Sequence, residues 1–269
     1  MPAFHLVDAF TAAYFSGNRA GVVLLEHGPV PAGFAQAVAA EVGASETAFL
    51  HPEDDGWRLR WWTPTTEVDL CGHATLAAAH VLTGEGAAPG AHRLRFHTRS
   101  GLLTATRDDD DRLWLELPSW PVADHRAPDR LPALLGGVSG RYLGRTTVAQ
   151  ANDVVEVADV AALDAVDPDL PAVAALGSGG LIVTSPGERT DAAMRYFAPA
   201  LGVDEDPVTG SAACTVGPLW ASRLGRSALV IEQRSARGGQ LWTRVAADRV
   251  EVGGHAVTTI RGELLAAPT

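Results

Sequence analysis

The chain has 269 residues, of which 46% are hydrophobic and 20% are charged, and its formal net charge is −11. This composition is ordinary for a globular protein of one large or two medium domains, and the acidic balance argues against nucleic-acid binding. The two cysteines, Cys71 and Cys214, are too few for a disulfide framework and have no zinc-binding spacing. Without a bilayer-spanning apolar run or a signal peptide, we expect a cytoplasmic protein that binds no membrane.

In chain order, the first part of the sequence predicts short strands interrupted by two helices. The segments that read as strands are 4–10, 21–25, 45–50, 57–63, 94–98 and 113–117. Apolar residues at helical spacing predict a helix over 32–42, which Gly43 closes. An Ala-rich run from His73 to Leu82 predicts a second, buried helix that ends near Gly84. The acidic run 108–111 is typical of a solvated hairpin tip.

Pro118 and Pro121 mark the expected boundary, so we divide the chain into halves 1–117 and 118–269. The second half is expected to repeat the order of the first, with a central helix from Ser211 to Leu224 that Pro218 kinks. Short links between strands favour antiparallel pairing. The predicted fold is therefore α+β, with an antiparallel sheet wrapped around one apolar helix in each half.

The two halves resemble each other in sequence. Residues 57–64 read W-R-L-R-W-W-T-P and residues 192–199 read A-A-M-R-Y-F-A-P, so that Arg60 aligns with Arg195. Further along, the triplet Arg99, Gly101 and Leu103 aligns with the triplet Arg237, Gly239 and Leu241. Self-similarity of this kind indicates two copies of one folding unit. We expect the two copies to form one cleft. The positions at which the copies differ are candidates for catalytic residues.

Each copy carries a small-residue turn at the start of its helix, Cys71-Gly72-His73 in the first and Thr209-Gly210-Ser211 in the second. A helix start offers unpaired N–H groups and the positive end of the helix dipole, and glycine lets a ligand approach closely. We therefore expect Gly72 and Gly210 to clamp a substrate carboxylate. The alternative is that these glycines only permit tight turns.

The differences between the copies include two titratable side chains. At a constant offset Glu46 lies opposite Leu181, and His73 lies opposite Ser211. In an apolar strand, burial would raise the pKa of Glu46 and suit it to proton transfer, unless it faces outward from an edge strand. His73 can donate, accept or relay a proton, although a lone histidine is more often structural.

Asp206 precedes the second helix start, where it could bind a substrate amine, act as a second carboxylate or cap the helix. Cys71 at the first helix start is expected to have a lowered pKa. Its thiol could therefore act as a nucleophile or as a base. A two-thiol mechanism would need a second cysteine where Thr209 stands. Cys214 lies further along and is expected in the core.

Four segments together resemble the phenazine-biosynthesis PhzF-like family, and the similarity extends over nearly the whole chain. They are Phe15-Ser16-Gly17-Asn18, Ser45-Glu46-Thr47-Ala48-Phe49, Asp69-Leu70-Cys71-Gly72-His73-Ala74-Thr75 and Glu205-Asp206-Pro207-Val208-Thr209-Gly210-Ser211-Ala212. The resemblance implies a diaminopimelate-epimerase-like fold with two pseudo-symmetric halves. It also implies a homodimeric isomerase that needs neither cofactor nor metal and acts on a small carboxylate-bearing metabolite.

The resemblance implies that Glu46 is the acid/base, with His73 and Asp206 as further catalytic residues. The residues implied in substrate binding are Asn18, Cys71, Gly72, Thr209, Gly210 and Ser211. Because Thr209 replaces the second cysteine of the epimerases of this fold, one carboxylate is favoured over a pair of thiols. Two alternatives stay open: an epimerase, racemase or dehydratase that uses Cys71, and a catalytically silent protein that binds a small acid.

Overall fold

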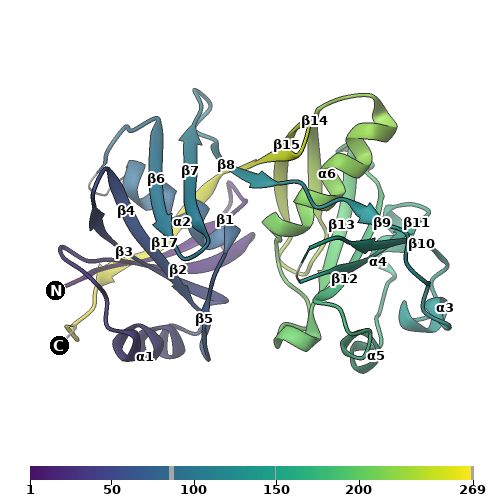
Figure 1. The fold of residues 1–269 in the computed structure, drawn as a ribbon, viewed down its shortest axis with the longest axis horizontal. Coiled ribbons are helices and arrows are strands. Elements are labelled where there is room, and N and C mark those ends of the chain that lie inside the picture. Colours follow the sequence, from purple (N-terminus) through teal and green to yellow (C-terminus); the bar gives the residue numbers. More distant parts are fainter. Residues whose placement is uncertain (85–87, 149, 268–269) are drawn as a thin grey trace. The chain divides into compact units, whose positions relative to one another are not determined.

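A computed structural model describes residues 1–84, 88–148 and 150–267, and these residues form two compact units (Figure 1). Unit 1 contains Met1–Glu116 together with the chain from Gly253 onwards, and unit 2 is Leu117–Val252. The chain leaves unit 1 along β8 (Leu113–Pro118) and returns along β16 (Arg249–Gly254).

Unit 1 is a sheet with two helices. Its other strands are β1 (Ala3–Ala9), β2 (Asn18–Leu24), β3 (Glu46–Glu53), β4 (Gly56–Trp62), β5 (Glu67–Val68), β6 (Arg93–Thr98), β7 (Gly101–Arg107) and β17 (Ala256–Glu263). Helix α1 (Ala32–Val42) has the predicted bounds and ends at Gly43, whose φ of 62° a glycine adopts without strain. Helix α2 (Gly72–Gly84) is buried on nearly every side, as its Ala-rich sequence predicts, and packs against β1, β2, β3 and β17.

Unit 2 repeats this plan. Its strands are β9 (Val122–Ala123), β10 (Gly140–Thr146), β11 (Asn152–Val157), β12 (Gly180–Pro186), β13 (Ala192–Phe197), β14 (Ala228–Gln233) and β15 (Gly239–Ala246). Its helices are α3 (Leu131–Leu134), α4 (Val160–Asp164), α5 (Leu170–Ala174), the short 3-10 turn Pro199–Leu201 and the central α6 (Gly210–Leu224). Helix α6 includes Pro218 and ends at Gly225, as predicted.

The sheets are mixed rather than antiparallel, which corrects the predicted pairing. In unit 1, β2 and β3 are parallel and so are β4 and β6; in unit 2 the corresponding parallel pairs are β11–β12 and β13–β14. Helices lie between the members of these pairs in sequence, and a helical crossover is what allows two strands to run parallel. The α+β class and the repeated plan of the two units are confirmed. The parallel strand pairs are repeated as well.

Strand β7 was not predicted from the sequence. Its side chains are mostly exposed or half-buried, so they carry little apolar alternation, and β6 and β8 hold it by antiparallel pairing on both sides. The acidic run 108–111 forms the connection between β7 and β8, where Asp108 accepts a hydrogen bond of 2.8 Å from Nε1 of Trp114.

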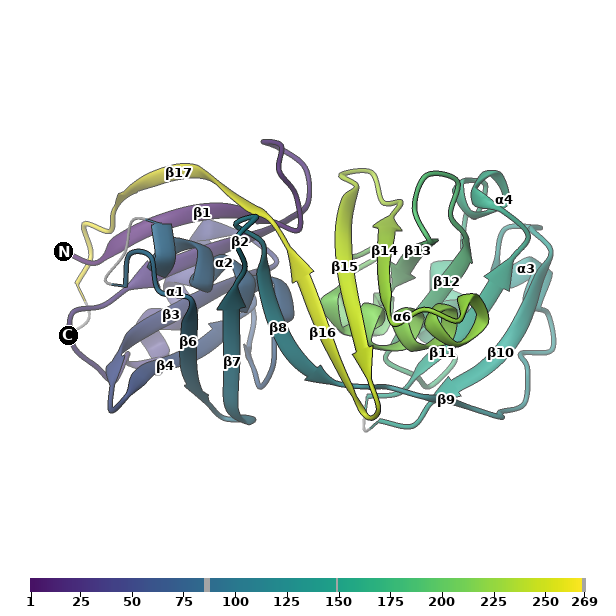
Figure 2. The ribbon, with the colours of Figure 1, turned by 90° about the horizontal axis from the view of Figure 1, so that it is seen from above.

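The units divide the chain differently from the predicted halves. The first boundary falls after Glu116, and the chain from Gly253 onwards belongs to unit 1 rather than to the second half. The cause is β17, which pairs antiparallel with β1 along its whole length, from Ala3 opposite Glu263 to Ala9 opposite Ala256. Figure 2 shows β17 running beside β1.

Candidate active site

Four of the predicted residues meet in unit 1, where two strands and a helix begin. Nε2 of His73 lies 3.1 Å from Oε2 of Glu46, the first residue of β3. The amide of Asn18, the first residue of β2, lies 3.2 Å from Nδ1 of the same ring. The thiol of Cys71, just before α2, lies 3.6 Å from Nδ1. His73 is therefore the centre of the cluster.

The first turn of α2 fixes the backbone on both sides of His73. The backbone N–H of Thr75 donates to the carbonyl of Cys71 at 3.1 Å, and the Thr75 hydroxyl donates to the same oxygen at 2.6 Å. His73 and Cys71 are only 6% exposed. The hydroxyl of Ser45 donates to the amide oxygen of Asn18 at 3.2 Å, which ties the ends of β2 and β3 together.

Glu46 and His73 form an ion pair, and this corrects the expected pKa of Glu46. Burial raises the pKa of Glu46, but the positive charge of His73 and the hydrogen bonding of His73 and Cys71 together outweigh burial, so the pKa lies below its usual value. Burial acts against the charge on His73, but attraction to a Cys71 thiolate and to the Glu46 carboxylate outweighs burial and holds the pKa of His73 well above its usual value. Where Cys71 keeps its proton, the Glu46 carboxylate is the charge that favours an imidazolium on His73.

Cys71 is a protonated thiol at neutral pH, and its expected low pKa is wrong. Burial raises the pKa of Cys71 to about 11, and the neighbouring Glu46 carboxylate acts in the same direction. The helix dipole does not compensate for the loss of water around the sulfur.

One oxygen of Glu46 keeps a free lone pair. Oε2 is buried, and Nε2 of His73, 3.1 Å away, is not aligned for a regular hydrogen bond to it. A carboxylate oxygen has two lone pairs, so Oε2 is able to accept a proton from a bound molecule while it faces His73.

The cluster also has the donor set of a metal site. Glu46, Cys71 and His73 each offer one ligand atom, and these atoms lie within 4.8 Å of one another. Carboxylate, thiolate and imidazole are zinc ligands, so these three residues could hold such an ion once Cys71 loses its proton. The sequence did not indicate this set because Glu46 is far from the other two along the chain.

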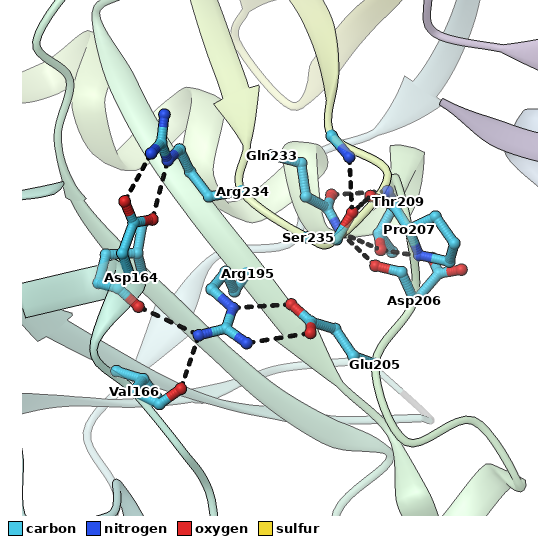
Figure 3. Close-up of polar contacts among 12 residues, drawn as sticks. Asp164, Val166, Arg195, Glu205, Asp206, Pro207, Thr209, Gln233, Arg234 and Ser235 are labelled. Carbon is cyan, nitrogen blue, oxygen red and sulfur yellow. Dashed lines mark hydrogen bonds and ion pairs between the residues drawn. The ribbon is translucent and has the colours of Figure 1, made fainter. Parts of the chain in front are cut away.

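The predicted residues of unit 2 lie at the start of α6, where Thr209 is the residue before the first helical position (Figure 3). The hydroxyl of Thr209 donates to Oδ2 of Asp206 at 2.5 Å. Gln233, at the end of β14, contacts both residues: its Oε1 accepts from the Thr209 N–H at 2.7 Å, and its Nε2 donates to the Asp206 carbonyl at 2.7 Å. Sequence reasoning missed Gln233.

Gly72 and Gly210 open α2 and α6, as predicted, and Ser211 lies in the first turn of α6. That the two helix starts bind one carboxylate stays a prediction. Cys214 is buried in α6, where its thiol donates to the Gly210 carbonyl at 3.5 Å, so its expected place in the core is confirmed.

The strand ladders correct the alignment of the two copies at Glu46. Phe49 is opposite Arg60 across β3 and β4, whereas Val183 is opposite Arg195 across β12 and β13. With Arg60 matched to Arg195, the residue equivalent to Glu46 is Gly180 and not Leu181. The hairpin between β12 and β13 is longer by one residue, which shifts the register. The asymmetry remains, because unit 2 has no side chain at this position.

A mixed α+β sheet around one helix, present twice, is the fold of the epimerase-like proteins. A predicted epimerase of Pseudomonas aeruginosa has this fold, with a TM-score of 0.71 at 23% identity over 99% of this chain and 100% of that one. The chain belongs to the phenazine biosynthesis-like family PhzC-PhzF, whose sequence model matches residues 7–262.

Relatives within the family cover the whole chain. An uncharacterized isomerase of Pseudomonas aeruginosa is 45% identical over 261 residues, which is 97% of each chain. The crystal structure of a PhzF-family phenazine biosynthesis protein of Enterococcus faecalis has a TM-score of 0.90 at 35% identity, over 98% of this chain and 99% of that one. In the part of the chain that the structure describes, none of the helices has the length and apolar character needed to cross a membrane.

Proposed function

We propose that this protein is an isomerase that moves a proton, and with it a double bond, within a small carboxylate-bearing metabolite. Glu46 is the acid/base. The observation that carries the proposal is the buried carboxylate of Glu46, whose Oε2 lies 3.1 Å from Nε2 of His73. The isomerase named among its relatives at 45% identity supports the general type of reaction.

The proposed reaction needs no oxidant or reductant. Oε2 of Glu46 takes a proton from a C–H bond of the substrate, and the released electron pair forms a new double bond. Glu46, now a carboxylic acid, returns the proton to a different carbon as the original double bond is lost. The imidazolium of His73 stabilises Glu46 as a carboxylate before the first step and after the second.

The remaining predicted residues would bind and orient the substrate. The N–H groups at Gly72-His73 and at Gly210-Ser211 would bind carboxylate oxygens, and Asp206 would bind an amine or hydroxyl group. Asn18 holds His73 through its amide, while Cys71 and Thr209 would line the site. The homodimer that the family resemblance implies is likewise a proposal.

The test is hydrogen–deuterium exchange at carbon. The wild-type protein would be incubated in D₂O with a panel of small unsaturated carboxylates, and deuterium uptake would be followed by mass spectrometry. We expect uptake into at least one compound, and a loss of roughly 10²-fold or more in Glu46→Gln. Glu41→Gln, at an exposed site in α1, is the matched control and should exchange like the wild type. Equal exchange by Glu46→Gln and wild type would overturn the proposal.

The same panel separates the rival functions. The position of Cys71 beside His73 favours a thiol-based epimerase as the second candidate. That reading requires Cys71→Ala to lose exchange while Glu46→Gln retains it. A protein that only binds small acids would shift in melting temperature with a panel compound and exchange none of them.

A further inference from the structure

Both units hold the segment before their central helix with a serine from a hairpin. In unit 1 the hydroxyl of Ser100 donates to the carbonyl of Asp69 at 2.6 Å. In unit 2 the hydroxyl of Ser235 donates to the carbonyl of Pro207 at 2.7 Å (Figure 3). Asp69 and Pro207 occupy the same place relative to the starts of α2 and α6, so the two serines are equivalent.

This equivalence gives Gln233 a counterpart in unit 1. Counting back from the serines matches Arg99 with Arg234, rather than with Arg237 as the sequence comparison had it, and matches Thr98 with Gln233. The ladders agree, since Thr98 is opposite Gly101 and Gln233 is opposite Gly239. Thr98 turns back on its own hairpin and donates to the Gly101 carbonyl at 2.7 Å. Gln233 is long enough to reach the start of α6.

The two residues that Gln233 joins, Thr209 and Asp206, have different counterparts in unit 1. Thr209 corresponds to Cys71, and Asp206, counted back from the helix start, corresponds to Val68. The chain Gln233–Thr209–Asp206 is therefore particular to unit 2, whereas the serine contact is common to both units.

Only one assignment of donors and acceptors fits the hydrogen bonds among Gln233, Thr209 and Asp206. Nε2 of Gln233 donates to the Asp206 carbonyl at 2.7 Å and to Oγ1 of Thr209 at 3.1 Å, which uses both of its protons. Turning the amide over would set its oxygen against the Asp206 carbonyl and its NH₂ against the Thr209 N–H, so the orientation is fixed. Because Oγ1 of Thr209 accepts a hydrogen bond from Nε2 of Gln233, its own O–H donates to Oδ2 of Asp206.

We infer that Gln233 is a positioning residue that directs the Thr209 hydroxyl onto Asp206 and so holds that carboxylate ionised and in one orientation. Gln233 is fully buried and Thr209 is 6% exposed, so water does not replace these bonds. The use of Asp206 towards a substrate rests on the proposed function, but the hydrogen-bonded chain does not.

The test is an NMR titration of the Asp206 side-chain carboxyl carbon in protein labelled with ¹³C aspartate. The signal is assigned by its loss in Asp206→Asn. Thr209→Val removes the hydrogen bond that the Thr209 hydroxyl donates to Asp206. Gln233→Met removes the amide donor that orients this hydroxyl. Each should raise the titration midpoint of Asp206 by about one pH unit, because a hydrogen bond to the charged form is lost. The double variant should show no larger shift than Thr209→Val alone.

Two controls separate this role from general loosening. Thr209→Ser keeps the hydroxyl and should titrate like the wild type. Ser235→Ala removes the shared contact in the same loop and should leave the midpoint unchanged. A Thr209→Val midpoint within about 0.3 pH units of wild type, or a shift in Ser235→Ala equal to that in Gln233→Met, would overturn the inference. Because the readout is a titration, it is independent of deuterium exchange, and the proposed function can fail without affecting it.

Discussion

At the scale of single residues, the sequence identified members of the buried cluster but not their charges. Glu46 and His73 stand out because the second copy has no equivalent, and both lie in the cluster as predicted. The expected pKa directions of Glu46 and Cys71 were wrong for different reasons. The sequence does not show how closely His73 approaches Glu46, and it does not show how completely the Cys71 thiol is buried. Gln233 was missed because its counterpart in unit 1, Thr98, can be identified only from the strand pairing.

The charged pair predicts a defined pH dependence of stability. The folded pKa of Glu46 is lowered, so its contribution is present above its ordinary pKa of about 4.5 and is lost as the pH falls through the folded value. The folded pKa of His73 is raised, so its contribution is complete below about 6.5 and is lost as the pH rises through the folded value. The pair therefore stabilises most between about pH 4.5 and 6.5.

His73→Gln tests this window. We expect it to lower the free energy of unfolding by about 3 kcal/mol near pH 6, because it leaves a buried carboxylate unpaired. The difference from wild type should narrow towards pH 9, as His73 loses its proton in the folded wild type. Urea unfolding at a series of pH values measures it, with the exposed His27→Gln as control. A difference that stayed constant from pH 5 to pH 9 would contradict the charged pair.

At the scale of the elements, a repeated arginine holds the segment before each central helix. Arg60 donates to both oxygens of Glu67, at 2.7 and 2.9 Å, and stacks on Trp62. Arg195 does the same with Glu205, at 2.7 and 3.0 Å (Figure 3). It also stacks on Phe197. The sequence comparison matched the arginines. It could not show their role, because the two glutamates lie outside the matched stretches.

Arg195 therefore has a structural role that lysine cannot fill. It also donates to the carbonyls of Leu163 and Val166, at 3.2 and 2.6 Å. Arg195→Lys should lower the free energy of unfolding by about 2 kcal/mol, because an ammonium group cannot reproduce the two-point contact with Glu205. Urea unfolding measures it, and Arg189→Lys, in the exposed loop before β13, is the matched control. Wild-type stability of Arg195→Lys would exclude this role.

At the scale of the whole molecule, the sequence predicted a repeat but not where the chain returns to its first unit. Helices α1 and α6 were predicted almost to the residue, because glycine caps and apolar spacing are local signals. The place of β17 is not local. It depends on pairing with β1, from the opposite end of the chain, and on packing against α2.

This division predicts which parts of the chain lose their structure together. Leu76 in α2 and Leu241 in β15 are both fully buried, one in each unit. Truncation of either to alanine should cost about 3 kcal/mol. Leu76→Ala should increase hydrogen exchange in both β1 and β17, whereas Leu241→Ala should increase it in β15 and leave β17 protected. Exchange followed by mass spectrometry in dilute denaturant resolves these segments. If Leu241→Ala exposed β17 as much as β15, the last strand would belong to the second half, as the sequence alone suggested.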